Sequence, residues 1–516
     1  MARKWWTLIV VCVGVFMLLL DITIVNVALP DIAGSLGASL SGLQWVIDAY
    51  ALALASLLLI AGILADRNGL RLLFIIGVGL FTVGSFLCGT ATGIVFLSIA
   101  RAGQGIGGAI MFATSLALLS ETFEGRERGI AFGIYGAMTG VAIAAGPVLG
   151  GALVTGLGWR WIFFVNIPVG AFVFVAALLR VDESRDPAPK RLDLLGFITF
   201  SGGLCALIFG LIRSNAAGWS SAQVIGSLVG AAVLLGGFVA NELLRHDPMF
   251  DLRLLRVPTF VGCLVAAFSI SASIFSVLTY LIFYVQDILG YSALQTGVRF
   301  LPMTMAIFFS AAGAGRLTSY LPTRVLIAPG FVIMGVGLLL MGGLTTADDW
   351  HHLLTGMILG GVGAGLVNVP LVATAVGVVA PRRAGMASGI NSTFRQMGIA
   401  TGIAVLGAIF LSRIESTIIT KLAGTPLASH SHEIALAAGS GRIGAGISQV
   451  PKALQPLVLS ATKSGFVNGL NLILLIAALL TFLAAVISFF LIREKDFVEG
   501  QGRQGRASRA PKQTVP

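Results

Sequence analysis

Charged residues are scarce in this sequence. They make up 11% of its 516 residues, whereas soluble domains carry about 25%. Hydrophobic residues make up 57% of the chain, and the mean hydropathy is +0.96. This composition excludes an ordinary soluble domain and indicates an integral membrane protein.

Groups that bind metals or phosphates are also few. The four cysteines all fall in apolar segments at spacings that suit no metal site, and the five histidines lie in predicted loops. No glycine-rich loop followed by lysine is present to cradle the phosphates of ATP. We therefore expect no metal site and no cofactor.

The apolar residues form many separate runs rather than one block. Each run is roughly 17 to 25 residues long, enough to cross about 30 Å of hydrocarbon as a helix, and none alternates as barrel strands do. We predict an all-α integral membrane protein with fourteen transmembrane helices. The predicted helices span residues 5–29, 45–64, 72–91, 94–118, 130–154, 162–180, 194–213, 222–242, 259–283, 297–315, 325–344, 353–379, 388–411 and 465–492.

The arginines fix the orientation of these helices. With both termini in the cytoplasm, the inner loops hold most of the arginines, while the short outer loops keep only Arg160, Arg213 and Arg299. This distribution follows the positive-inside rule. The net charge of +11 then matches the anionic lipid of a cytoplasmic leaflet, and a nucleic-acid partner is not expected.

Short segments of the first half recur in the second half. Three matches at nearly one offset indicate an internal repeat. The matching pairs are 129–134 with 385–390, 105–107 with 361–363, and 62–71 with 315–324, at offsets of 256, 256 and 253 positions.

The repeat divides the chain into two six-helix bundles, at 1–192 and 259–492, with two additional helices at 193–258 between them. Two parallel repeats, with the substrate near the midplane at their interface, are typical of secondary transporters rather than of channels. We expect residues 412–464 to form a long outer loop with short surface helices and turns, and residues 493–516 to form a disordered cytoplasmic tail.

Asp21 is the deepest acid of the first predicted helix. A carboxylate inside a membrane is a functional-site hypothesis by default. Arg101 lies in the fourth predicted helix on the same face as Gln104. It needs a partner there, and Asp21, a backbone carbonyl or water could serve. The alternative for Arg101 is a structural tie between helices.

Two further polar residues stand out in the first two predicted helices. Asp48 lies about a turn from the outer end of the second helix, where a structural acid is as plausible as a functional one. Asn26 is about 140° round the helix from Asp21, so the two side chains cannot share a face. We interpret Asn26 first as an interhelical hydrogen-bond donor.

The segment 62–71 resembles the cytoplasmic loop signature of the major facilitator superfamily, although Leu70 stands where that family usually has a basic residue. Glycines here permit close helix approach and a tight turn, and the charges can form a network that breaks when two bundles rock. An ordinary polar loop is the alternative. The predicted conformational-switch loop consists of Gly62, Asp66, Arg67, Gly69 and Arg71.

The fifth predicted helix carries Gly146, Pro147, Gly150 and Gly151. A proline between glycines predicts a kinked, closely packed helix, and generic small-residue packing is one interpretation. The segment also resembles the motif of superfamily antiporters, with Ala142 where that pattern often has glycine. This resemblance implies export.

Segments 20–30, 159–168 and 384–396 resemble the fourteen-span drug:proton antiporters of the EmrB/QacA type. The resemblance implies proton-coupled efflux of lipophilic or cationic drug-like compounds by alternating access, across a bacterial cytoplasmic membrane and driven by the proton gradient. It further implies that Asp21 and Arg101, with Asp48 in a secondary role, handle the proton. The substrate-path candidates are Asn26, Gln104 and Arg395.

Other functions fit less well or stay open. A dedicated exporter of one metabolite, antibiotic, siderophore or lipid is equally compatible with the sequence. The fifth helix argues against an importer, and an intramembrane enzyme would need a cluster of reactive groups that the sequence lacks. The expected partners are small amphiphiles, protons and the lipid bilayer. A monomer is the simplest expectation, and accessory export partners are left open.

Overall fold

The computed structural model is built from helices. It describes residues 3–38, 40–123, 125–184, 193–245, 252–318, 320–379, 384–431, 434 and 454–498, and no strand occurs among them. Eleven helices of this part of the chain are long and apolar enough to cross a membrane, and shorter apolar stretches lie in others. The prediction of an all-α membrane protein is confirmed.

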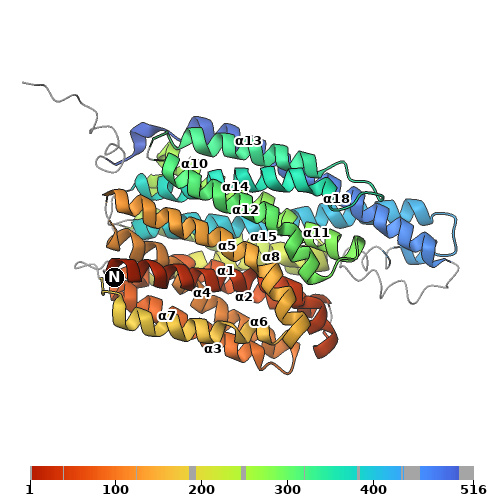
Figure 1. Cartoon of the computed structure of the whole chain (residues 1–516), viewed down its shortest axis with the longest axis horizontal. Coiled ribbons are helices and arrows are strands. Elements are labelled where there is room, and N and C mark those ends of the chain that lie inside the picture. Colours follow the sequence, from red (N-terminus) through yellow and green to blue (C-terminus); the bar gives the residue numbers. More distant parts are fainter. Residues whose placement is uncertain are drawn as a thin grey trace, which may run out of the picture.

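The helices of the N-terminal half run side by side along the longest axis of the molecule (Figure 1). Gly69 begins the turn after α2 with a φ of 119°, a backbone conformation that glycine adopts without a steric penalty. The helices are α1 (Arg3–Leu36), α2 (Leu40–Asn68), α3 (Leu70–Gly89), α4 (Ile94–Thr122), α5 (Gly125–Leu157), α6 (Trp161–Phe164) and α7 (Asn166–Arg180).

The remaining helices form a lateral pair and a C-terminal half. A π-helical segment, η2 (Ser271–Phe275), joins α10 to α11. The lateral pair is α8 (Leu194–Ala217) and α9 (Ala222–Leu244). The C-terminal half contains α10 (Pro258–Ile270), α11 (Ser276–Phe283), α12 (Ala293–Leu317), α13 (Arg324–Met341), α14 (His351–Gly377), α15 (Ala384–Leu422) and α18 (Gln455–Leu491).

The structure agrees with the predicted sixth helix and corrects the predicted outer loop. Only Val165, whose backbone angles are helical, separates α6 from α7, so Trp161–Arg180 is one apolar span. The predicted outer loop, 412–464, is helical at both ends, because α15 reaches Leu422 and α18 begins at Gln455. Buried Ile414, Ile418 and Leu422 share one helical face and belong to the same apolar core as residues of α18.

The start of the predicted tail is ordered as well. Residues 493–498 are described, and Asp496 accepts a hydrogen bond of 2.7 Å from the hydroxyl of Thr259 at the start of α10. This contact holds the chain end against the C-terminal half. Residues 432–433 and 435–453 of the predicted loop and residues 499–516 of the predicted tail lie outside the described part of the chain.

The repeat in the sequence has a counterpart in the packing of glycines. A side-chain carbon built on Gly77 of α3 would lie 3.0 Å from the carbonyl oxygen of Gly107 of α4. One built on Gly330 of α13 would lie 3.1 Å from the carbonyl oxygen of Gly363 of α14. The two pairs are related by the same offsets, 253 and 256 positions, as the sequence matches. The close approach of α3 to α4 is therefore repeated by α13 and α14.

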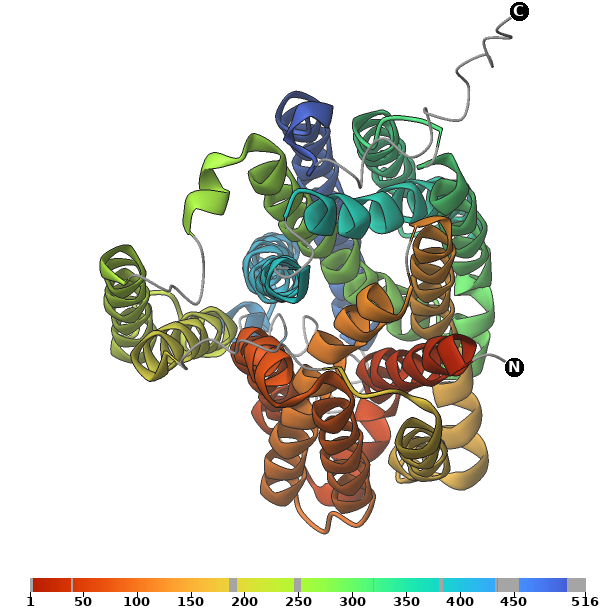
Figure 2. The same ribbon diagram turned by 90° about the vertical axis from the view of Figure 1, so that its left-hand side faces the viewer.

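The two halves meet along particular helices. α5 packs against α1 of its own half and against α12 of the other half. On another side, α8 contacts both α2 and α15, while α9 packs mainly on α8. Figure 2 shows α8 and α9 as a pair standing outside the ring of the other helices. The cavity described below lies between the halves and is lined by α1, α4, α5, η2, α14 and α15.

Candidate functional site

A charged network lies inside the N-terminal half. Asp21 of α1 is 0% exposed and Arg101 of α4 is 1% exposed. Nη1 of Arg101 donates to Oδ2 of Asp21 at 2.5 Å and to Oε1 of Gln104 at 2.7 Å. Nε2 of Gln104 in turn donates to Oδ1 of Asp21 at 2.9 Å. The structure therefore brings together the three residues that the sequence placed in the first and fourth helices.

The guanidinium of Arg101 is held from a second side by α2. Its Nε donates to the carbonyl oxygen of Val46 at 3.1 Å, and its Cζ lies 4.1 Å from the centroid of the Tyr50 ring. A cation over an aromatic face is stabilised most where water is excluded. Arg101 thus links α1, α2 and α4, as the structural interpretation of this residue requires. Its role in proton handling stays a prediction.

Asn166 and Ser85 complete the network. Neither is among the predicted site residues, although Asn166 lies in the segment 159–168 that carries the family resemblance. Nδ2 of Asn166 donates to Oδ1 of Asp21 at 3.0 Å and to the hydroxyl of Ser85 at 2.9 Å. Asn166 is the first residue of α7. It lies on the buried face that also carries Gly170, Val173 and Ala177, and this face directs its amide into the bundle.

Asp48 is not part of this network. It lies on the same helix as Tyr50, and the cation that acts on its charge is Arg213 of α8. The Cζ of Arg213 lies 5.7 Å from the ring centroid of Trp45, one turn before Asp48. Asp48 therefore belongs to the contact of α2 with the lateral helix pair.

The predicted switch loop is described in part. Gly62 is buried and Arg67 is exposed. Arg71 contacts the chain after α7, because its Nη1 donates to the carbonyl oxygen of Val181 at 3.2 Å and its Nε lies 3.7 Å from Glu183. The predicted network of Asp66 with the arginines cannot be followed, since the Asp66 side chain lies outside the described residues, as do those of Asn26 and Pro147.

The glycines of the predicted antiporter motif face α1. A side-chain carbon on Gly146 would overlap the side chain of Thr23. One on Gly150 would lie 2.8 Å from Cγ1 of Ile24. Both neighbours follow Asp21 within one turn, so α5 touches α1 directly beside the charged network. Small residues at a helix contact permit this close approach.

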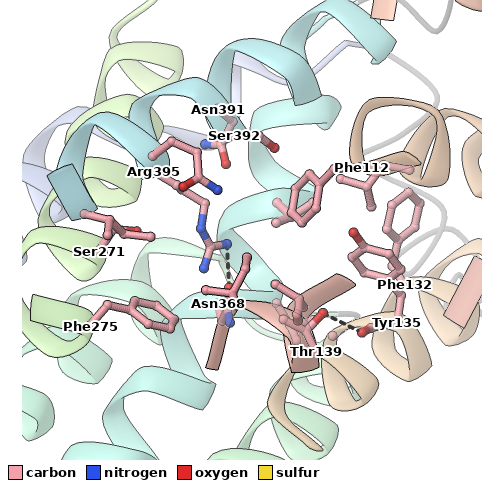
Figure 3. Close-up of a pocket in the computed structure, with 18 of the residues that line it drawn as sticks. Phe112, Phe132, Tyr135, Thr139, Ser271, Phe275, Asn368, Asn391, Ser392 and Arg395 are labelled. Carbon is pink, nitrogen blue, oxygen red and sulfur yellow. Dashed lines mark hydrogen bonds between the residues drawn. The ribbon is translucent and has the colours of Figure 1, made fainter. Parts of the chain in front are cut away.

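A cavity lies between the two halves (Figure 3). Its volume is about 100 Å³, below the roughly 300–1,000 Å³ of typical drug-sized ligand sites. α1, α4 and α5 form one wall, and η2, α14 and α15 form the other. Leu19, Ile22 and Thr23 line it, but Asp21 and Gln104 do not. A bound molecule would therefore not contact Asp21 directly and would affect it only by displacing α1.

Of the three substrate-path candidates, Arg395 is the one that the structure places in the cavity wall. Its Nη1 donates to Oδ1 of Asn368 at 2.7 Å (Figure 3). Aromatic side chains face it across the cavity, among them Phe112, Phe132 and Tyr135. The cavity is thus largely apolar, with polar groups concentrated around Arg395.

The chain resembles known transporters over most of its length. The model of the Major Facilitator Superfamily matches residues 11–403. Multidrug resistance protein Stp of Mycobacterium tuberculosis is 38% identical over 413 residues, which are 80% of this chain and 77% of that protein. The tetracenomycin C resistance and export protein of Streptomyces glaucescens is 32% identical over 496 residues, 95% of this chain and 91% of that protein.

A solved structure shows the same fold. The human organic anion transporter MFSD10 aligns with a TM-score of 0.60 at 15% identity, over 95% of this chain and 99% of that chain. The matches confirm the resemblance to drug:proton antiporters of the EmrB/QacA type. They identify a secondary transporter, which needs no cofactor, and not an enzyme. The chain belongs to the Major Facilitator Superfamily and is a multi-pass membrane transporter.

Proposed function

We propose that this protein exports lipophilic, drug-like compounds in exchange for protons by alternating access. The observation that carries the proposal is the pairing of a sealed, charged network inside one half with an apolar cavity between the halves. The names of the relatives, a multidrug resistance protein and an antibiotic resistance and export protein, support drug-like substrates.

The proposed architecture has fourteen transmembrane helices. Counting α6 with α7 and α10 with α11 as single spans gives six spans at 1–192, two at 193–258 and six at 259–492. The repeated glycine contacts support two parallel six-helix bundles. We place the protein in a bacterial cytoplasmic membrane with both termini inside, which follows from the distribution of arginines.

α1 connects the two parts of the site. Asp21 points into the bundle, whereas Ile22 and Thr23, the next two residues, line the cavity. Gly146 of α5 packs directly on Thr23. A movement of α5 with the opposite half therefore displaces α1 and changes the distance between Asp21 and Arg101. Separation of the pair would leave two buried charges without their partners, and protonation of Asp21 removes one of them.

The proton gradient supplies enough energy for export. One charge moved across ~150 mV gives roughly 3.5 kcal/mol, which supports a gradient of a neutral substrate on the order of 300-fold. Coupling then requires only that substrate occupancy and protonation of Asp21 disfavour each other. Because the substrate cavity and Asp21 lie on different faces of α1, the substrate disfavours protonation of Asp21 only indirectly.

Transport into everted membrane vesicles tests the proposal. Wild type should accumulate a lipophilic dye when a proton gradient is applied and should release protons when dye is added, as followed with a pH-sensitive probe. Asp21→Asn should abolish both signals. Asp31→Asn is the matched control, because Asp31 lies on the same helix with an exposed side chain. Full proton-driven efflux by Asp21→Asn would disprove the role of this carboxylate.

A further inference from the structure

Arg395 carries a charge that the described part of the protein does not neutralise. Its single hydrogen bond there is to the amide oxygen of Asn368, and no carboxylate lies within ion-pair distance of it. Of the described residues that line the cavity, Arg395 alone is charged. A neutral amide satisfies one of the five N–H groups of a guanidinium. The others are left for a group that enters the cavity.

Two hydroxyl groups beside the same cavity also have no partner. The hydroxyl of Tyr135 on α5 and that of Ser271 on η2 are buried without a hydrogen bond in the described structure. Tyr135 is 6% exposed and Ser271 is 0% exposed, and both residues line the cavity. Figure 3 places Tyr135 on the wall opposite Arg395 and Ser271 on the same wall. Buried donors without a partner are unusual and call for one.

A ligand with an acidic group would satisfy all three. Guanidinium and carboxylate match each other in geometry, since two parallel N–H groups can donate to two oxygens. A hydroxyl donor on either wall could add a further hydrogen bond. A cationic group in the same place would instead face Arg395 at low dielectric, where like charges repel strongly.

We propose that Arg395, with Tyr135, binds the acidic group of an amphiphilic substrate, a carboxylate or phenolate, while the aromatic wall holds the apolar body. This inference rests on the proposed export function and narrows its substrate class from lipophilic or cationic compounds to lipophilic acids. Phe112, Phe132 and Phe275 supply the apolar surface around the ligand. The acid end lies between Arg395 of α15 and Tyr135 of α5, and the body extends toward Phe112 of α4 and Phe275 of η2.

The test uses three fluorescent probes that share one apolar body: pyrenebutanoate, its methyl ester, and the corresponding pyrenebutyl trimethylammonium. Binding to the full-length protein in neutral phosphatidylcholine nanodiscs is measured at pH 7.4. Wild type should bind the carboxylate about 10- to 100-fold more tightly than the ester, as expected for a charge-assisted hydrogen-bonded pair. The ammonium probe should bind most weakly.

Variants assign the preference to individual residues. Arg395→Gln should remove the preference for the carboxylate while leaving the affinity for the ester within about 3-fold, and Arg395→Lys should keep part of it. Tyr135→Phe should weaken only the carboxylate, by about 3- to 10-fold. Arg413→Gln is the matched control, because Arg413 lies on the same helix outside the cavity with an exposed side chain, and it should keep the preference.

The outcomes separate this inference from the proposed function. If wild type prefers the ester or the ammonium probe, or if Arg395→Gln and Tyr135→Phe weaken all three probes alike, the acid site is disproved. Proton-driven dye efflux by wild type in vesicles would still uphold the export function in that case. Conversely, an acid preference that depends on Arg395 in a protein that exports nothing would uphold the site and disprove the function.

A second experiment tests whether the acidic group can belong to a lipid headgroup or only to a soluble compound. Pyrenebutanoate binding is repeated in nanodiscs that contain phosphatidylglycerol. If the anionic lipid competes with the probe in wild type but not in Arg395→Gln, the site accepts a lipid headgroup as well as a soluble acid. If it does not compete, the ligand is a soluble amphiphile. Both results support recognition of an acidic group by Arg395, and loss of probe binding that is equal in both proteins contradicts it.

Discussion

The two halves of this transporter differ in how they neutralise an arginine inside the protein. In the N-terminal half, Arg101 is 1% exposed and lies 2.5 Å from a carboxylate of the same half. In the C-terminal half, Arg395 faces the cavity, and among the described residues its only hydrogen-bond partner is the amide of Asn368. The N-terminal half supplies the carboxylate that neutralises Arg101, whereas no described carboxylate of the C-terminal half neutralises Arg395. The halves share a repeated helix arrangement, so the difference lies in side chains rather than in fold.

The largest effect is expected from Arg101→Ala. It would leave Asp21 buried without its countercharge, which costs about 3–5 kcal/mol in the free energy of unfolding. Thermal unfolding in detergent, followed for wild type and variant, measures the loss. Arg395→Ala should destabilise the protein less, because Arg395 has no ion pair in the described structure. Equal losses of stability in the two variants would contradict the difference between the halves.

A double variant separates stability from coupling. Asp21→Asn combined with Arg101→Gln removes both charges and keeps groups that can form hydrogen bonds. We expect it to recover most of the stability that Arg101→Ala loses, since replacing both members of a buried pair is far less costly than removing one. Proton-driven efflux should stay absent. Recovery of coupled transport would mean that the network is only a structural tie.

Asn166→Ala should have an intermediate effect. It removes one of the three side chains that donate to Asp21, at about 1–3 kcal/mol. The pH dependence of dye efflux should shift in this variant, because the balance between the charged and protonated carboxyl changes. Asn368→Ala in the other half is the matched control, and it should leave that pH dependence unchanged.

Gly146→Ala tests how the halves communicate. The added carbon would overlap Thr23, and overpacking of this kind costs about 1–3 kcal/mol. Efflux should slow more than substrate binding weakens, and Thr23→Ala in the same chain should restore part of the rate. Gly156→Ala on the same helix meets nothing within 4 Å and should behave as wild type.

The smallest effect is expected outside both halves. Asp193 caps α8, accepting a 2.8 Å hydrogen bond from the backbone of Gly196, and it pairs with Arg245 at the end of α9. Asp193→Ala should cost about 1 kcal/mol of stability without altering proton coupling or substrate preference. A change in either property would show that the lateral helix pair belongs to the transport machinery.

The stability from Asp193 should also depend on pH. Burial raises the pKa of Asp193, but the hydrogen bonds from Gly196 and Asn241 and the contact with Arg245 outweigh it, so the pKa is lowered overall. A lowered native pKa stabilises the fold above the ordinary value of about 3.9 and ceases to do so as the pH falls below it. The difference in melting temperature between wild type and Asp193→Ala should therefore shrink on acidification.

Much of this arrangement could be predicted from the sequence. The apolar runs indicate the helices, and a deep charge in a membrane needs a partner, so Asp21 could be predicted as one of three candidate partners of Arg101. The three-residue spacing of Arg101 and Gln104 predicts their shared face. These inferences depend on composition and on helical periodicity, which are local properties of the chain.

Other features depend on contacts between distant segments. Asn166 reaches Asp21 because the buried face of α7 is turned toward α1, and an apolar run does not reveal which helix such a face meets. That Arg395 faces the cavity while Asp21 faces away from it depends on how α15 and α1 are rotated against their neighbours. Periodicity identifies a face of a helix but not what that face meets. The same limit applies to the helical ends of the predicted loop, whose apolar face is covered by α18.

The unneutralised charge of Arg395 has an electrical consequence. The Asp21–Arg101 pair carries no net charge, so moving it as a unit through the membrane field does almost no work. A lone cation beside a cavity that opens in turn to each side does cross part of that field, which amounts to roughly 2.3 kcal/mol for a full charge across 100 mV. The return of the empty carrier should therefore respond to membrane voltage, and an acid bound at Arg395 should cancel that response.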